Sequence, residues 1–305
     1  MRRGLVLLVS VALVALTACS GDDPPPFGPD AGSAALQPYE GLGTWVDAFD
    51  YAPSFQSGAL PAVTPDAVDD MAGLGVQTLY LQASKDDARS PEAIVDTTLV
   101  GEFLTRAHEH EMRVVAWYLP TLGNIDADFA HIEALHEFEV DGQRFDSIAL
   151  DIEWTEGVPY TSARNQALVR LSRRTRALVG DDAALGAIVF PPVQTEVINP
   201  VLWPDFPYGD LAPLYDVWMP MAYWTFREGE YRDPVRYTEE SIERLRNNLD
   251  DPDAAMHPIG GIGDLATPGD YEAFMHAVRE TDSIGWSIYD YATSASTSWA
   301  RLVDE

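Results

Sequence analysis

The chain has 305 residues, of which 22% are charged, and a formal net charge of −30 at pH 7. So large an acidic excess opposes binding to nucleic-acid phosphates and to anionic membrane surfaces. A single cysteine allows no intrachain disulfide, and the six histidines show no spacing typical of a metal site. The composition therefore argues against a nucleic-acid partner and indicates no metal or other cofactor.

The first 18 residues have the pattern of a lipoprotein signal peptide. Two arginines precede an apolar run over residues 5–16, and Leu16-Thr17-Ala18-Cys19 reads as a lipobox. The alternative, a transmembrane anchor, is disfavoured because a spanning helix needs about 20 apolar residues. We therefore expect export, cleavage before Cys19, lipidation of Cys19 and attachment to the outer face of the cell membrane. Loss of the leader removes two arginines and no acid, which changes the net charge from −30 to −32.

Residues 19–38 are rich in proline, glycine and aspartate, which predicts a flexible linker. The remaining residues, 39–305, have a length typical of one α/β barrel domain.

Short apolar segments typical of strands recur along residues 39–305, separated by stretches with helical periodicity. There are eight such segments, at residues 43–51, 76–84, 113–120, 145–153, 185–192, 216–224, 257–264 and 284–291. Eight alternating βα units predict a closed (β/α)8 TIM barrel. The competing architecture is a doubly wound open sheet, but no glycine-rich phosphate loop follows the first segment.

Helices are expected after residue 64 and over residues 97–111, 124–140, 160–180, 233–249 and 267–281. Three of them begin with an N-cap residue followed by proline, at Thr64-Pro65, Asp233-Pro234 and Thr267-Pro268.

The fourth predicted strand carries two carboxylates at its end. Its apolar residues alternate with Ala149, Asp151 and Glu153, so both acids share one face, with Cα atoms about 6.5–7 Å apart. Two adjacent carboxylates cannot both ionise freely, so one pKa should rise, which creates a general acid at neutral pH. The alternative is a pair of solvated charges where a strand ends.

Polar and aromatic side chains also gather at the other predicted strand ends, where barrels of this kind place their active sites. They are Trp45, Asp47, Tyr80, Gln82, Tyr118, Tyr223, Trp224, Asp264, Trp286 and Asp290. Aromatic rings suit the C–H faces of sugars and polar groups suit their hydroxyl rims, so the set predicts a carbohydrate cleft. Any single ring could instead be packing inside the barrel.

With these residues the chain resembles glycoside hydrolase family 18, the chitinase-like barrels. The family's D-G-x-D-x-D-x-E motif is matched by Asp146-Ser147-Ile148-Ala149-Leu150-Asp151-Ile152-Glu153 at three of four acids, with Ala149 at the second. Its M-x-Y-D motif corresponds to Met221-Ala222-Tyr223-Trp224, and its tryptophan at the floor of the sugar site to Trp286. The third-strand S-x-G-G motif is absent from Val115-Ala116-Trp117-Tyr118-Leu119-Pro120.

The resemblance implies retaining hydrolysis of β-linked N-acetylhexosamine glycans, as in chitin or peptidoglycan, without a cofactor. Glu153 would protonate the leaving oxygen, Asp151 would orient the 2-acetamido group that attacks the anomeric carbon, and Tyr223 would donate a hydrogen bond to that group. Further substrate contacts would come from Trp286, Trp45, Asp47, Gln82, Tyr118, Met221, Trp224, Asp264 and Asp290.

The seventh strand offers an independent observation. Ordinary retaining glycosidases need a second carboxylate about 5–5.5 Å from the first, and residues 257–264 contain no glutamate, only Asp264. This favours the substrate-assisted route, which needs no enzyme nucleophile. Two alternatives stay open: a barrel that binds polysaccharide without cleaving it, and a glycosidase that pairs Glu153 with Asp264 or Asp47.

Overall fold

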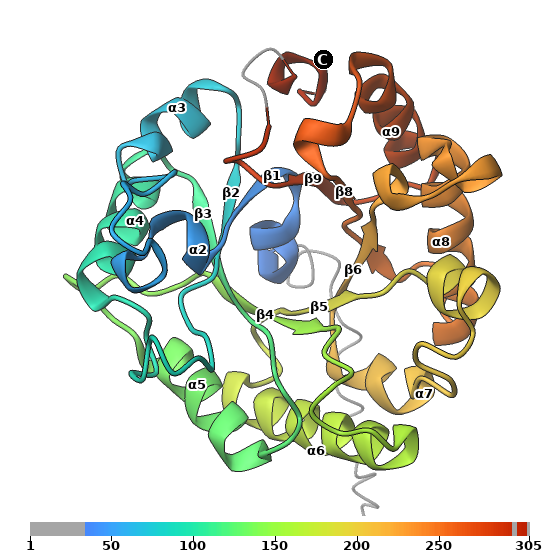
Figure 1. Cartoon of the computed structure of the whole chain (residues 1–305), viewed down its shortest axis with the longest axis horizontal. Coiled ribbons are helices and arrows are strands. Elements are labelled where there is room, and N and C mark those ends of the chain that lie inside the picture. Colours follow the sequence, from blue (N-terminus) through green and yellow to red (C-terminus); the bar gives the residue numbers. More distant parts are fainter. Residues whose placement is uncertain (1–33, 295–297, 304–305) are drawn as a thin grey trace, which may run out of the picture.

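The computed structural model describes residues 34–294 and 298–303, which form a ring of strands surrounded by helices (Figure 1). The predicted signal peptide, Cys19 and most of the predicted linker lie outside these residues. No helix of the described part is long and apolar enough to cross a membrane.

All strand pairings are parallel, and the pairing of β5 with β6 closes the sheet into a barrel. The seventh position of the barrel is split, because β7 and β8 both pair with β6. The predicted TIM barrel is thus confirmed, and closure rules out the open sheet. The strands are β1 (Gly41–Val46), β2 (Thr78–Leu81), β3 (Arg113–Tyr118), β4 (Ser147–Ile152), β5 (Leu185–Val189), β6 (Val217–Ala222), β7 (Ala255–Met256), β8 (Ile259–Gly261) and β9 (Gly285–Tyr289).

Helices cover the outside of the barrel, apart from the short α2 that directly follows β1 (Figure 1). They are α2 (Ala48–Tyr51), α3 (Ala67–Gly73), α4 (Thr97–Glu109), α5 (Ile125–Glu137), α6 (Thr161–Val179), α7 (Tyr208–Leu211), α8 (Pro234–Leu249) and α9 (Pro268–Glu280).

Two of the three predicted N-caps are confirmed. The side chain of Asp233 accepts a hydrogen bond from Arg236 N, and Thr267 forms a reciprocal capping box with Asp270. The third prediction is wrong, because residues 64–66 form a turn and α3 begins at Ala67, with Asp66 at the N-cap position.

The strand side chains divide into an inner and an outer cluster. On β4, Ala149 belongs to the inner cluster, whereas Ile148, Leu150 and Ile152 pack under the helices, as the alternation predicts. The face of β4 that carries Ala149 also carries Asp151, which therefore points into the barrel.

The amino-terminal end of the barrel is filled by side chains. Tyr39 donates a 2.7 Å hydrogen bond to Ile148 O, and the buried His257 lies 2.8 Å from Tyr39 O and 3.0 Å from Ser287 Oγ. Gly186 makes room for Tyr39, because a Cβ there would lie 2.8 Å from its ring. With this end filled, the inward side chains leave a cavity at the carboxyl end.

Candidate active site

A cavity of about 320 Å³ lies where the strands end at their carboxyl termini. Seven of the predicted site residues line it: Trp45, Asp47, Gln82, Asp151, Glu153, Met221 and Tyr223. The other lining residues are Phe49, Lys85, Trp117, Leu119, Ile188, Phe226, Ile262 and Tyr289. A larger hollow of about 1210 Å³ runs along the outer side of α8, but it holds no buried acid pair and is open to solvent.

The carboxylates of Asp151 and Glu153 share this cavity. Asp151 is 7% exposed, and Glu153, directly after β4, is half-buried. Burial raises the pKa of both groups, and the charge of Glu153 raises that of Asp151 further, whereas the positive charge of Lys85 lowers both. The pair is therefore suited to retain a proton at a pH where isolated carboxylates have lost theirs.

Asp151 Oδ1 is buried without a hydrogen-bond partner among the described residues. The next inward position of β4 is Ala149, whose methyl group offers no donor, and the residue opposite Asp151 on β5 is Ile188. An unpaired buried carboxylate oxygen costs free energy, so this atom is ready to accept a hydrogen bond from a ligand.

Tyr223 follows β6 and lines the same cavity. Burial raises the pKa of its hydroxyl, and the charges of Glu153 and Asp151 raise it further. The phenol therefore keeps its proton and can donate a hydrogen bond. Its ring lies 6.0 Å from that of Tyr289 and 6.3 Å from that of Phe226, between centroids.

Trp45 is held rigidly in the inner cluster. Its ring stacks on Tyr80 at 4.4 Å between centroids and meets Trp117 edge to face at 5.9 Å. Its indole Nε1 donates a 2.8 Å hydrogen bond to Ser287 Oγ. The cavity thus has an aromatic wall whose orientation is fixed before any ligand binds.

Both carboxylate oxygens of Asp47 already accept hydrogen bonds. Oδ1 accepts from Phe49 N at 2.7 Å and from Asp50 N at 3.2 Å, and Oδ2 accepts from the hydroxyl of Tyr289 at 2.8 Å. Gln82 supports the same loop, since its Oε1 accepts from Ala48 N at 3.0 Å. Asp47 therefore caps α2 and ties the end of β1 to that of β9.

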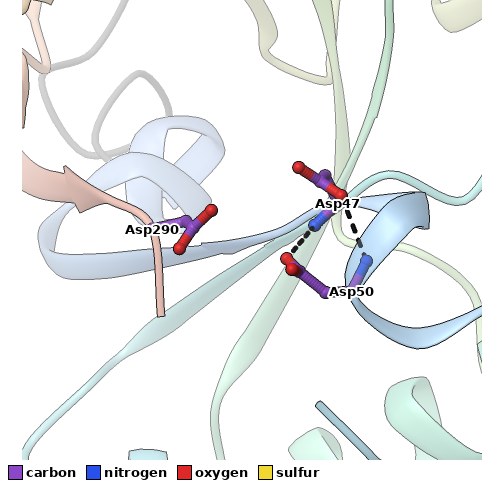
Figure 2. Close-up of side chains that lie close together, drawn as sticks. All are labelled: Asp47, Asp50 and Asp290. Carbon is purple, nitrogen blue, oxygen red and sulfur yellow. Dashed lines mark hydrogen bonds between the residues drawn. The ribbon is translucent and has the colours of Figure 1, made fainter. Parts of the chain in front are cut away.

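Asp47, Asp50 and Asp290 place three carboxylate oxygens within 4.8 Å of one another at the ends of β1 and β9 (Figure 2). Burial together with the charges of the other two raises the pKa of Asp50 to about 7. Asp50 Oδ2 accepts from Asp47 N, and Asp290 Oδ1 accepts from Thr293 N. Backbone N–H groups therefore donate to all three acids, and the raised pKa of Asp50 lessens the charge repulsion among them as pH falls below about 7.

Trp286 lies on the outer side of the barrel wall. On β9 the inward residues are Ser287 and Tyr289, because Ser287 bonds to Trp45 and Tyr289 lines the cavity. Trp286 instead packs against the outer cluster and donates a 2.8 Å hydrogen bond to Leu302 O. The structure therefore does not bring it to the acid pair.

Four further predicted site residues, Tyr118, Trp224, Asp264 and Asp290, are not among the residues that line the cavity. On β3, Trp117 faces inward and Tyr118 outward, where its hydroxyl donates to Asp128 Oδ1 at 2.9 Å. Trp224 is fully buried against Phe274 in the outer cluster. Asp264 is exposed and does not line the cavity, and Asp290 lies instead in the acid group with Asp47 and Asp50.

Lys85, Trp117 and Tyr289 line the cavity but are missing from the sequence-based set. The two aromatic residues each lie one position from a predicted residue, and a shift of one residue along a strand changes the face. The sequence did contain a sign that Lys85 belongs to the site, because it is the only lysine of the chain and follows the end of a predicted strand.

Comparison with solved structures supports the fold. The chain is similar to the spore cortex-lytic enzyme SleL of Bacillus cereus, with a TM-score of 0.61 and 8% identity over 86% of this chain and 73% of that chain. It is similar to a family 18 N-acetylglucosaminidase of Paenibacillus barengoltzii (TM-score 0.57, 9% identity, 86% and 98% covered). It is also similar to the exo-β-1,4-mannosidase Op5Man5 of Opitutaceae bacterium strain TAV5 (TM-score 0.59, 13% identity, 83% and 52% covered).

No sequence-family model and no curated protein sequence matches the chain. Identities this low show a shared fold alone, and the structural neighbours include enzymes with different names and substrates. The barrel architecture implied by the family 18 resemblance is thus confirmed, whereas the reaction depends on the side chains that line the cavity.

Proposed function

We propose that this barrel is a retaining glycoside hydrolase that cleaves β-linked N-acetylhexosamine glycans by a substrate-assisted mechanism. The observation that carries the proposal is the buried, unpartnered Oδ1 of Asp151 beside Glu153 in one cavity. The N–H of a 2-acetamido group is a donor that would satisfy this oxygen. The structural neighbours named as a spore cortex-lytic enzyme and as an N-acetylglucosaminidase are in keeping with such a substrate.

In the first step Glu153 donates its proton to the leaving glycosidic oxygen while the acetamido carbonyl oxygen attacks the anomeric carbon. The glycosidic bond breaks, a bond from the carbonyl oxygen to the anomeric carbon forms, and the product is an oxazolinium ion. Asp151 accepts the acetamido N–H and its negative charge stabilises the cationic ring, while Tyr223 donates to the carbonyl oxygen. In the second step Glu153 takes a proton from water, which opens the ring with retention.

An enzyme nucleophile is less well supported. Asp264 lies outside the cavity, and both oxygens of Asp47 are already held by backbone N–H groups and Tyr289. A hydrogen-bonded carboxylate is a poorer nucleophile than a free one, because attack would give up these bonds. The binding-only alternative rests on Ala149 and Trp224, which replace two acids of the family motifs.

Reducing-sugar release from chitin oligosaccharides and peptidoglycan should separate these alternatives. We expect Glu153→Gln to lose at least about 10²-fold in rate while keeping substrate affinity, because it preserves shape but has no transferable proton. A thiazoline analogue of the oxazoline should inhibit the wild type. Binding without cleavage in both proteins would establish a capture module, and full activity in Glu153→Gln would refute the acid assignment.

Export and lipid anchoring are part of the same proposal and rest on the pattern at Arg2, Arg3 and Cys19. Cells grown with labelled palmitate should incorporate the label into the wild type and not into Cys19→Ala. Equal labelling of both proteins, or of neither, would contradict it.

A further inference from the structure

The cavity contains the only lysine of the chain. Lys85 follows β2, is half-buried and lines the cavity together with Asp151 and Glu153. The proposed reaction gives this ammonium group no role. Its positive charge lowers the pKa of both reacting carboxylates, which opposes retention of the proton that the general acid needs. A function for Lys85 in ligand binding would explain its position.

The ammonium group of Lys85 forms no ion pair within 4.0 Å and no hydrogen bond with any residue that the structure describes. Its nitrogen lies over the ring of Phe49, 4.8 Å from the centroid. The nearby Arg89 differs, since it also lies over Phe49, at 5.5 Å, but pairs with Asp87 at 2.7 Å. A cation–π contact orients an ammonium group without neutralising it, so the N–H donors of Lys85 stay available to a ligand.

The acids around Lys85 are less able to neutralise it than their number suggests. The carboxylate of Asp47 already accepts hydrogen bonds from two backbone N–H groups and from the hydroxyl group of Tyr289. Burial raises the pKa of Asp151 and that of Glu153, so the pair holds a proton more readily than exposed carboxylates do. The cavity can therefore take up one anionic group close to Lys85.

We propose that Lys85 is a specificity-determining residue that binds a carboxylate on the glycan. The preferred substrate is then an acidic N-acetylhexosamine glycan, such as one with the lactyl carboxylate of peptidoglycan sugars, rather than neutral chitin. This inference rests on the proposed function and narrows its substrate class. A compact ammonium group and a carboxylate form a charge-assisted hydrogen bond that a neutral hydroxyl cannot match.

The test compares two tetrasaccharides that differ only in their 3-O-lactyl groups, which carry the carboxylates. One is chitotetraose, and the other is a peptide-free chain of alternating N-acetylglucosamine and N-acetylmuramic acid. We expect the wild type to have a higher kcat/KM for the acidic chain, and Lys85→Gln to lower the ratio of the two values about tenfold, as one charged hydrogen bond allows. Lys85→Arg, which keeps the charge, should retain most of the ratio, and salt should reduce it.

Using the ratio cancels any effect of Lys85 on the acid pair, because that effect applies to both substrates. An unchanged ratio in Lys85→Gln, or a wild type without preference for the acidic chain, would overturn the inference. A folding defect in a variant would lower kcat/KM equally for both substrates. Thermal melts of the two Lys85 variants check for such a defect.

Binding separates this inference from the proposed function. Calorimetry with Glu153→Gln and with the double variant that adds Lys85→Gln gives the Kd of each tetrasaccharide without cleavage. If the wild type cuts neither chain, the proposed function fails, yet a Kd ratio that falls about tenfold in the double variant would still support a carboxylate site at Lys85. The same Kd ratio in Glu153→Gln and in the double variant, or no binding of the acidic chain, would refute the carboxylate site at Lys85.

Discussion

The hydroxyl group of Tyr289 donates a 2.8 Å hydrogen bond to Asp47, which joins the last strand of the barrel to the first beside the cavity. Asp47 also caps α2, so one carboxylate positions both the loop after β1 and the aromatic ring at the end of β9. Around it, burial and neighbouring acids shift the titration of several groups. The wall of the cavity is therefore a connected network, and its parts can be tested singly.

Tyr289→Phe keeps the ring and removes the hydrogen bond to Asp47. We expect the free energy of unfolding to fall by about 1–2 kcal/mol, since the acceptor is charged and partly buried. Urea unfolding at pH 7 measures this. Tyr291→Phe is the matched control, because the Tyr291 hydroxyl has no hydrogen bond to the described residues, and an equal loss in both variants would contradict the assignment.

The pH dependence of kcat/KM reports the acid pair. Glu153 must be protonated to act as the acid, and burial raises its pKa, so activity should persist above the pH at which an exposed glutamate ionises and then fall as pH rises. Lys85 lowers this pKa, so Lys85→Gln should move the alkaline limb to higher pH. Lys85→Arg should leave it in place, and a shift to lower pH in Lys85→Gln would show that another group sets this limb.

The fold and the acid pair could be predicted from sequence because their signals are local. On β4, Ile148, Leu150 and Ile152 alternate with less apolar residues, which fixes the face of Asp151. On β3, by contrast, every residue from Val114 to Tyr118 is buried. Barrel strands are covered on both sides, so such a run has no periodicity that tells inside from outside.

The position of Trp286 could not be predicted for the same reason. The face of β9 that points into the barrel is set by hydrogen bonds of Ser287 with Trp45 and His257, which are distant in sequence. Lys85 and Phe49 lie in loops after the strands, and their contact depends on how two loops meet across the barrel end. Neither relation is contained in a local pattern.

Substitution of two tryptophans tests this difference in placement. Trp286→Phe loses the hydrogen bond to Leu302 O, so we expect the free energy of unfolding to drop by about 1 kcal/mol with an unchanged KM. Trp117→Phe changes the cavity wall and should raise KM. Steady-state kinetics and urea unfolding of both variants give the comparison, and a raised KM in Trp286→Phe would place that ring in the substrate site after all.

Asp50 makes stability depend on pH. Burial first, and then the charges of Asp47 and Asp290, raise its pKa from 3.8 to about 7. The folded state therefore binds more protons than the unfolded state between these values, so this group's contribution to stability falls as pH rises from about 4 to 7 and stays low above that.

Asp50→Asn removes the charge but keeps an oxygen that can accept from Asp47 N, so it should remove this pH dependence. We expect it to stabilise the fold at pH 8 by about 1–2 kcal/mol, less than the full shift implies because Asp50 is partly exposed and its charge is screened. At pH 4 the variant and the wild type should unfold alike. Thermal melts across pH 4–8 measure the difference, with the exposed Asp182→Asn as the control for loss of one negative charge. A gain of the same size at both ends of this range would mean that the effect does not come from titration of Asp50.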